Sequence, residues 1–261
     1  MRLRGQGGLL WKSLPVVQLL FRLIGKGWNP FYGWMLDRQE KRNTIKMLLR
    51  RADQIKTERR DKGLYDLSRG TYHVNYLKRY GLKSNHIVLD FGCGFGRTGI
   101  PLVQYLEPGN YIGVEISKER LRLAEEWTEL ESLQPKQPRW LLEFDNSLSY
   151  LEDGDIDVIW AQSVLTHMPK REVEIFMGAA HRVLRPGAAL MFNFTISEDD
   201  ALHRSNVKDY RYPPAQIEAL CKSEGFTYIR LDDWQDDLDE DARAGHNQMI
   251  KATKPDPKAT P

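Results

Sequence analysis

The sequence is poor in cysteine and has no long uninterrupted apolar run. Its 261 residues include only two cysteines, Cys93 and Cys221, which argues against a disulfide framework and favours a reducing compartment, the cytoplasm. No cleavable signal sequence is evident. The most apolar stretch, residues 9–24, is interrupted by charged residues and a proline, so it falls short of the roughly 20 apolar residues that a membrane-spanning helix needs. We therefore expect an intracellular globular chain that buries one large core.

Net charge is also low, at +2, but it is unevenly distributed. Residues 1–62 carry fifteen Lys and Arg against five Asp and Glu, a net of +10 that leaves −8 on the rest of the chain. Apolar residues at near-helical spacing predict that this segment is a basic, amphipathic helical extension. Residues 1–30 add Trp11, Phe21 and Trp28, a combination typical of helices that lie on a membrane surface. Packing on the chain's own domain or on a second subunit in an oligomer explains the same pattern, and nucleic-acid contact is the least favoured alternative.

Strand and helix patterns alternate regularly from about residue 86 onward. Short apolar runs predict seven strands, at 86–91, 111–115, 140–144, 156–161, 188–194, 226–231 and 247–252, and amphipathic segments predict helices that include 97–106, 118–130 and 214–224. Such repetition is typical of an α/β fold with a doubly wound sheet. We therefore divide the chain into the N-terminal extension (1–62), the α/β domain (63–253) and a Pro- and Lys-rich flexible tail (254–261).

A glycine-rich loop follows the first predicted strand. Gly92, Gly94 and Gly96 let the backbone turn sharply and approach a nucleotide-like ligand at the amino end of a helix. The glycines alone do not choose the ligand, because Gly94-x-Gly96-x-x-Gly99 also fits a dinucleotide. Asp90 distinguishes the two ligands, since a carboxylate at the strand end repels a pyrophosphate and favours the ammonium group of S-adenosylmethionine.

Polar side chains also end the next two predicted strands. Glu115, with Ile116 beside it, is placed to accept hydrogen bonds from ribose hydroxyls. Asp145 could accept a hydrogen bond from the exocyclic amine of adenine, and the Asn146 backbone could donate to the ring. One acid at a strand end is ordinary on a protein surface, but three in register with a glycine loop favour a cofactor site.

Five segments in chain order carry a family resemblance. They are VLDFGCGFGRTG, YIGVEIS, LLEFDNSLSYL, IDVIWAQSVLTHMP and HRVLRPGAALMFNF, within residues 72–253. Together they resemble the Rossmann-like, class I S-adenosylmethionine-dependent methyltransferase superfamily, particularly its small-molecule type 11 and type 12 branch. The resemblance implies S-adenosyl-L-methionine as the cofactor and a mostly parallel seven-stranded sheet with an antiparallel last strand, the cofactor lying over the carboxyl ends of the strands.

Residues after the fourth predicted strand are candidates for the substrate side of the site. Gln162 and Ser163 follow the strand where this family contacts the methionine part of the cofactor, so we expect both to line the site. His167 is placed to act as a general base toward a substrate hydroxyl or carboxyl group. A structural role for His167 explains its position equally well, because methyl transfer often needs only alignment of the reactants.

Two further groups of aromatic and basic residues flank the predicted site. The first group lies where related enzymes cover the cofactor with a helix: Tyr65, Arg69, Tyr72, His73 and Tyr76. The second lies where this family varies its substrate pocket: His203, Arg204, Tyr210, Arg211 and Tyr212. Tyr72 is a candidate cofactor contact, although Tyr72 and Tyr76 also fit a buried helical stripe. Cys93 is expected to pack rather than to react. No metal-binding spacing is evident, and the acidic run 232–239 is expected to be solvated.

Three functions stay open at this point. The favoured one is methyl transfer to a small or lipid-like molecule, at oxygen. A nucleic-acid (RNA) methyltransferase could use the basic N-terminus, but WAQS after the fourth strand differs from the Asn/Asp-Pro-Pro-aromatic motif of base amino-group methylases. The third is a non-catalytic, cofactor-binding module associated with a membrane.

Overall fold

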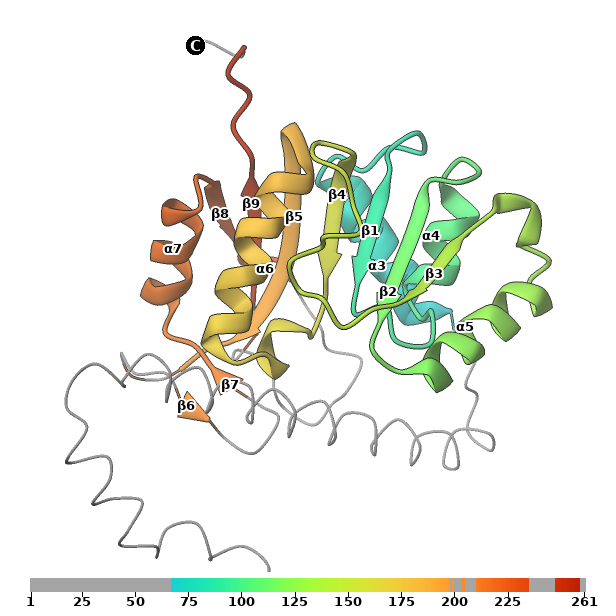
Figure 1. Ribbon diagram of the computed structural model, residues 1–261, viewed down its shortest axis with the longest axis horizontal. Helices are drawn as coiled ribbons and strands as arrows, with labels where there is room; N and C mark the ends of the chain where they lie inside the picture. The colour runs from blue at the N-terminus through green and yellow to red at the C-terminus, as the bar shows by residue number, and fades with distance from the viewer. Residues whose placement is uncertain (1–66, 198, 200–202, 205–209, 235–246, 259–261) are drawn as a thin grey trace, which may run out of the picture. The chain divides into compact units, whose positions relative to one another are not determined.

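A computed structural model describes residues 67–197, 199, 203–204, 210–234 and 247–258 (Figure 1). The predicted N-terminal extension, residues 1–62, and Tyr65 lie outside the described residues, so their assignments stay predictions. Of the helices within the described ranges, none is both long enough and apolar enough to cross a membrane.

Seven strands form one central sheet in the order β3-β2-β1-β4-β5-β9-β8. Their bounds are β1 (Val88–Phe91), β2 (Tyr111–Glu115), β3 (Arg139–Leu142), β4 (Ile156–Ala161), β5 (Leu184–Thr195), β8 (Thr227–Leu231) and β9 (Asn247–Thr253). Strands β3 to β5 pair in parallel along this order, whereas β9 pairs antiparallel with both β5 and β8. The expected doubly wound, mostly parallel sheet with an antiparallel last strand is therefore confirmed.

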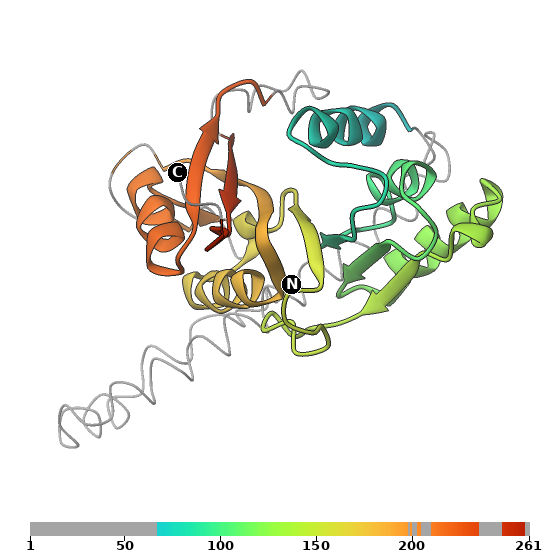
Figure 2. The same cartoon turned by 90° about the horizontal axis from the view of Figure 1, so that it is seen from above.

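Helices cover both faces of this sheet (Figure 2). The first face carries α3 (Ser68–Arg79), α4 (Gly99–Tyr105) and α5 (Lys118–Leu130), and the second carries α6 (Lys170–Val183) and α7 (Pro214–Ser223). Alternation along β1 shows the two sides, because Val88 packs with the first group while Leu89 and Phe91 pack with the second. Two short 3₁₀ segments, η2 (Gln134–Lys136) and η3 (Leu165–His167), complete the helical elements of the described chain.

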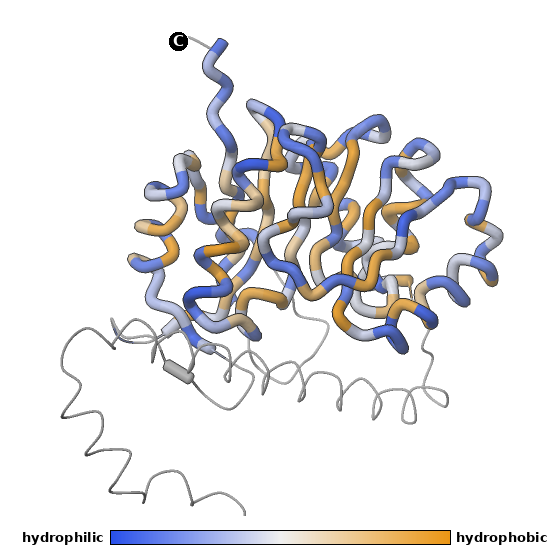
Figure 3. The backbone as a smooth tube through the Cα atoms, in the orientation of Figure 1, coloured by the Kyte–Doolittle hydropathy of each residue, from blue (hydrophilic) through white to orange (hydrophobic). Residues whose placement is uncertain are grey.

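Burial of the strands explains why the sheet reads as apolar in sequence. Every residue of β1 and β2 is buried, as expected where helices cover both faces of a parallel sheet. Figure 3 shows apolar residues concentrated along the central strands and polar ones on the outer turns of the helices. The start of α5 is fixed locally by Ser117, whose Oγ accepts a hydrogen bond of 3.3 Å from the Arg120 backbone.

Three features differ from the sequence-based expectation. A separate two-stranded sheet forms between β6 (His203–Arg204) and β7 (Tyr210–Arg211). Strand β3 ends two residues earlier than expected, at the edge of the sheet where it has one neighbour. Lys254, assigned to the flexible tail, still exchanges backbone hydrogen bonds with β5, donating to the Ala188 carbonyl and accepting from the Gly187 amide.

Candidate functional site

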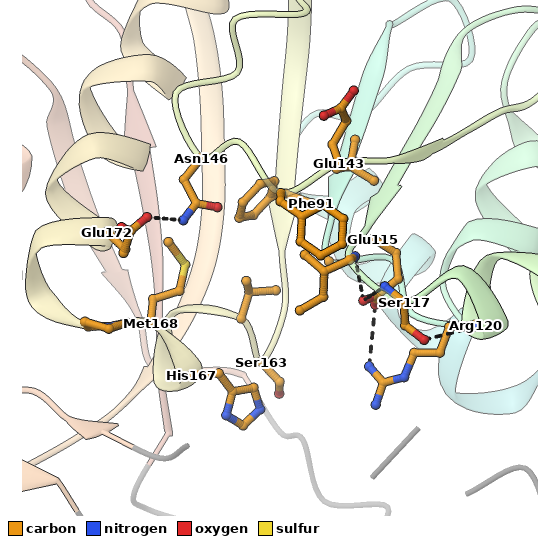
Figure 4. A pocket seen from close by; sticks show the side chains of 16 residues that line it. Phe91, Glu115, Ser117, Arg120, Glu143, Asn146, Ser163, His167, Met168 and Glu172 are labelled. Atoms are coloured by element: carbon orange, nitrogen blue, oxygen red, sulfur yellow. Dashed lines mark hydrogen bonds and ion pairs between the residues drawn. The ribbon is translucent and has the colours of Figure 1, made fainter. Parts of the chain in front are cut away.

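A cavity opens at the carboxyl ends of β1, β2, β3 and β4 (Figure 4). Carboxyl ends of parallel strands are where open α/β sheets bind ligands. The lining residues come from these strand ends, from the start of α5 and from the chain leading into α6: Phe91, Gly92, Val114, Glu115, Ile116, Ser117, Arg120, Glu143, Phe144, Asn146, Ser163, Val164, His167, Met168, Pro169 and Glu172.

The glycine loop follows β1 directly and borders this cavity. Gly92 has a φ of +74°, and a Cβ there would lie 2.5 Å from Val164, so glycine is required both by conformation and by space. Gly94 has a φ of +61°, and a Cβ there would meet nothing within 4 Å. Gly96 lies against α5, where a Cβ would approach Ala124 to 3.2 Å. Cys93 is buried, and burial raises the pKa of its thiol well above the usual value, which agrees with packing rather than reaction.

Glu115 links the loop to the second strand. Its Oε2 accepts a 3.1 Å hydrogen bond from the Gly94 amide, and its Oε1 accepts from the amides of Ile116 (2.8 Å) and Ser117 (3.1 Å). Arg120 reaches Oε2 at 3.5 Å, the longest of the four contacts. The carboxylate is therefore held in a fixed orientation at the cavity wall although its side chain is only 6% exposed.

Asp90 is buried beneath the loop and does not line the cavity. Its Oδ2 accepts a 2.9 Å hydrogen bond from the Tyr111 hydroxyl. The pKa of Asp90 is raised to about 7, chiefly by burial; the Tyr111 hydrogen bond opposes this rise and the Glu115 charge adds to it. Its predicted contact with the methionine ammonium group stays a prediction, because this carboxyl group faces the tyrosine.

Asp145 and Asn146 point in different directions after β3. Asp145 accepts hydrogen bonds from the backbone and hydroxyl groups of Ser147 and Ser149 and is not part of the cavity lining. Partial burial raises the pKa of Asp145, but these hydrogen bonds outweigh burial and hold it below its ordinary value. Asn146 does line the cavity, and its Nδ2 donates to Glu172 Oε2 at 2.6 Å.

Ser163 and His167 lie together at another end of the cavity (Figure 4). Ser163 has a φ of +56°, and its amide donates a 2.6 Å hydrogen bond to Oδ1 of the fully buried Asn193 on β5. Its hydroxyl accepts from Gln162 Nε2 at 2.7 Å; Gln162 itself is not part of the lining. His167 ends the 3₁₀ turn η3, whose backbone bond from the His167 amide to the Val164 carbonyl measures 2.8 Å.

Helix α3 packs against the glycine loop without lining the cavity. A Cβ at Gly70 would lie 1.9 Å from the Arg97 carbonyl oxygen, so the helix approaches the loop as closely as glycine permits. His73 is fully buried, shares a 2.7 Å hydrogen bond with Thr98, and has its pKa lowered to about 3 by burial and the nearby Arg69 and Arg97 charges. The imidazole is therefore neutral and structural.

Aromatic residues of α3 form a cluster with Trp160 and Trp234. Tyr72 lies with its ring centroid 5.6 Å from that of Trp234 and 6.2 Å from that of Tyr76. This agrees with the buried-stripe alternative for Tyr72 and does not bring it to the cavity. In the second flanking group, Tyr210 and Tyr212 are also buried, and the Tyr212 hydroxyl donates to the Met168 carbonyl.

The acidic run is not simply solvated at its start. Asp233 accepts hydrogen bonds from the hydroxyls of Tyr76 (2.9 Å) and Tyr80 (2.7 Å) and pairs with Arg79 at 2.9 Å. Asp233 is exposed, as expected for this charge run, and its carboxylate also binds the neighbouring hydroxyl and guanidinium groups. No three His, Cys, Asp or Glu side chains among the described residues are grouped so as to hold a metal ion.

Six of the thirteen predicted cofactor and catalytic residues meet around the cavity. Gly92, Glu115, Ile116, Asn146, Ser163 and His167 line it; Asp90, Cys93, Gly94, Gly96, Asp145, Gln162 and Tyr72 do not. Sequence reasoning missed Arg120, Phe144 and Glu172. Phe144, 45% exposed after β3, adds an apolar wall, and an aromatic residue at the end of a predicted strand is the signal that could have indicated it.

Comparisons with known proteins point in one direction. Residues 89–190 match a family described as "Methyltransferase domain". The chain is 29% identical over 121 residues to "Probable methyltransferase ltbC" of Aspergillus luteorubrus, covering 45% of this chain and 42% of that protein. It is 32% identical over 118 residues to "Methyltransferase GfsG" of Streptomyces halstedii, covering 43% and 39%. Each match spans about two-fifths of the relative's length.

The similarity to a solved structure covers a larger share of this chain. Magnesium protoporphyrin IX methyltransferase (ChlM) from Synechocystis PCC 6803 with bound SAM has a TM-score of 0.55 and 19% identity, covering 71% of this chain and 77% of that one. At this identity the likeness concerns the fold.

Proposed function

Because the chain belongs to the Rossmann-like, class I S-adenosylmethionine-dependent methyltransferase superfamily, we propose that it transfers a methyl group from S-adenosyl-L-methionine to an oxygen atom of a small or lipid-like molecule. One observation carries the proposal. Gly92, the Glu115 carboxylate and the polar pair Ser163 and His167, which follow three different strands, border one cavity at the carboxyl edge of the sheet.

The residues around the cavity fit an adenosine-containing cofactor. Glu115 presents a carboxylate, the acceptor that ribose hydroxyls need, and Arg120 makes the weakest of its contacts at 3.5 Å. A ribose hydroxyl can therefore replace Arg120 while the three backbone amides keep the carboxylate in place. Ile116 and Phe144 supply apolar surface for a purine ring.

The chain's own groups then have distinct tasks. The cofactor, when bound, supplies an electrophilic methyl group on a sulfonium. Glu115 orients the ribose, and Ser163, locked by Asn193 in a left-handed conformation, shapes the other end of the cavity. His167 beside Ser163 is positioned to accept the proton from a hydroxyl or carboxyl group of the acceptor. Alignment of the acceptor by the cavity supplies the remainder of the rate enhancement.

Calorimetry tests the cofactor assignment directly. The wild-type protein should bind S-adenosylhomocysteine and show no heat with nicotinamide dinucleotides. Gly94→Val should abolish binding, because φ is +61° at this position and a β-branched residue there would distort the loop whose amide donates to Glu115. The matched control is Gly109→Val, which places the same side chain at a φ of +83° in an exposed turn. Binding of the dinucleotides instead of the thioether would overturn the proposal.

The proposal also covers the methyl acceptor and the cellular location of the protein. Low cysteine content supports the cytoplasm, and the basic, aromatic residues 1–30 support peripheral contact with a membrane surface. A comparison of metabolites between a deletion strain and its parent should reveal compounds that differ in mass by one methyl group. Recombinant protein should methylate the demethylated compound at oxygen, whereas methylation at nitrogen or carbon would correct the atom assigned.

A further inference from the structure

Three acceptor side chains, those of Glu143, Asp145 and Asn146, follow β3. Among the hydrogen bonds of the described residues, only Asn146 has a side-chain partner on another element, Glu172. Asp145 uses both carboxylate oxygens on Ser147 and Ser149, with hydroxyl contacts of 2.5 to 2.8 Å. These bonds turn it onto its own chain and away from the cavity lining. Sequence position alone therefore predicts Asp145 as the acceptor that faces the purine, although both of its carboxylate oxygens already accept hydrogen bonds from serines.

Asn146 is oriented by Glu172, which lies in the first turn of α6. The bond from Asn146 Nδ2 to Glu172 Oε2 measures 2.6 Å. An ionised carboxylate only accepts hydrogen bonds, so the amide nitrogen must face Glu172 and the amide oxygen must face away from it. Figure 4 shows the Asn146 oxygen on the side of the cavity. Within the described part of the chain this oxygen accepts no hydrogen bond.

We propose that Glu172 is a positioning residue that holds the Asn146 carbonyl oxygen as the acceptor for the exocyclic amine of a 6-aminopurine. The inference rests on the proposed adenosine-containing cofactor and adds how its base is selected. A 6-oxopurine presents an acceptor at the same position, so two oxygens would face each other and the site would reject it.

The charge on Glu172 is what makes this selection strict. A neutral side chain of the same shape could donate as well as accept a hydrogen bond. The Asn146 amide could then turn over and present its NH₂ group to the cavity. A 6-oxopurine would bind better to that arrangement, while a 6-aminopurine would lose part of its advantage.

Calorimetric affinities for S-adenosylhomocysteine and S-inosylhomocysteine test the proposal. We expect the wild-type protein to prefer the adenosyl compound by roughly tenfold or more. Glu172→Gln should reduce this ratio to less than about a third of its wild-type value, mainly by tighter inosyl binding. Asn146→Ala should bring the ratio close to unity by weakening adenosyl binding.

A matched control and two competing variants make the result decisive. Glu174→Gln removes the same charge from an exposed position two residues along α6 and should keep the wild-type ratio. An unchanged ratio in Glu172→Gln and Asn146→Ala overturns the inference, as does a ratio that changes only in Asp145→Asn or Glu143→Gln. If the wild-type protein binds neither compound, the proposed function falls together with the inference; binding of both with one ratio throughout removes the inference alone.

Discussion

At the scale of single residues, Asp90 carries the clearest electrostatic consequence. Its pKa is raised to about 7, chiefly by burial, so folding disfavours its charged form. The folded chain binds more protons than the unfolded chain between pH 3.8, the ordinary pKa of an aspartate, and about pH 7. Stability from this group is therefore complete below pH 3.8 and is lost as the pH rises through about 7.

Asp90→Asn should remove this pH-dependent loss while keeping an oxygen for the Tyr111 hydroxyl. Each pKa unit corresponds to about 1.4 kcal/mol, and 1 kcal/mol shifts the melting temperature of a domain this size by roughly 2–4 °C. The variant should gain several degrees relative to wild type between pH 5 and pH 8, measured by thermal unfolding. Asp232→Asn, at an exposed position, should follow the wild-type profile. Parallel profiles for Asp90→Asn and wild type would contradict the assigned ionisation.

One substitution distinguishes a catalytic role of His167 from a structural one. If it accepts the acceptor's proton, His167→Ala should lower turnover by roughly a hundredfold or more, with affinity for S-adenosylhomocysteine nearly unchanged. A structural role would lower the melting temperature or the cofactor affinity instead. An unchanged turnover number, measured once the acceptor is known, removes His167 from the mechanism and leaves alignment as the main source of catalysis.

At the scale of elements, α3 is fixed at both ends. Its start contacts the glycine loop through Gly70 and His73, and its end is bonded to Asp233 after β8. Asp233→Ala would leave the Tyr76 hydroxyl, on a residue that is 1% exposed, without its acceptor. We expect a loss of about 1–3 kcal/mol in the free energy of unfolding, measured by urea denaturation. Asp232→Ala is the control, and equal midpoints for the two variants would show that the Asp233 contacts do not stabilise the protein.

The central elements could be predicted from the sequence, and the peripheral ones could not. The bounds of β2, β4 and α5 agree with the expected ones because continuous apolar runs and a Ser cap define them. Strand β3 was misplaced because an edge strand with exposed ends lacks that continuous burial. The β6–β7 hairpin has only two residues in each strand, too few for any periodicity to show.

Some residues of the site could likewise be predicted from the sequence, and others could not. The strand-end positions of Gly92 and Glu115 follow from sheet topology, which sequence alternation indicates. The orientation of Asp145 depends on Ser147 and Ser149, and an Asp followed by Ser two residues later is a local turn signal that could have shown it. The part played by Glu172 depends on how α6 meets the chain after β3, a long-range contact with no local signature.

At the scale of the whole molecule, the basic front end predicts binding to anionic vesicles. Residues 1–30 combine cationic and aromatic residues, so binding should have a salt-sensitive charge component and a salt-insensitive apolar component. Co-sedimentation should weaken but persist at high salt, and deletion of residues 1–30 should remove it. If the full-length chain stays in the supernatant with anionic vesicles at low salt, the prediction of membrane contact is wrong. Residues 1–30 are then better explained by packing on the chain's own domain or on a second subunit.

The close approach of Gly70 to the Arg97 carbonyl limits how the chain can be recombined. A Cβ at position 70 would lie 1.9 Å from that oxygen, and His73 is bonded to the loop only one turn further along α3. The start of α3 therefore packs against the glycine loop, although eighteen residues or more separate it from Gly92 in the sequence. A chimera that grafts a foreign N-terminal segment onto this domain must place its crossover before Gly70, since a junction between α3 and β1 would pair the loop with a helix that was not shaped to meet it.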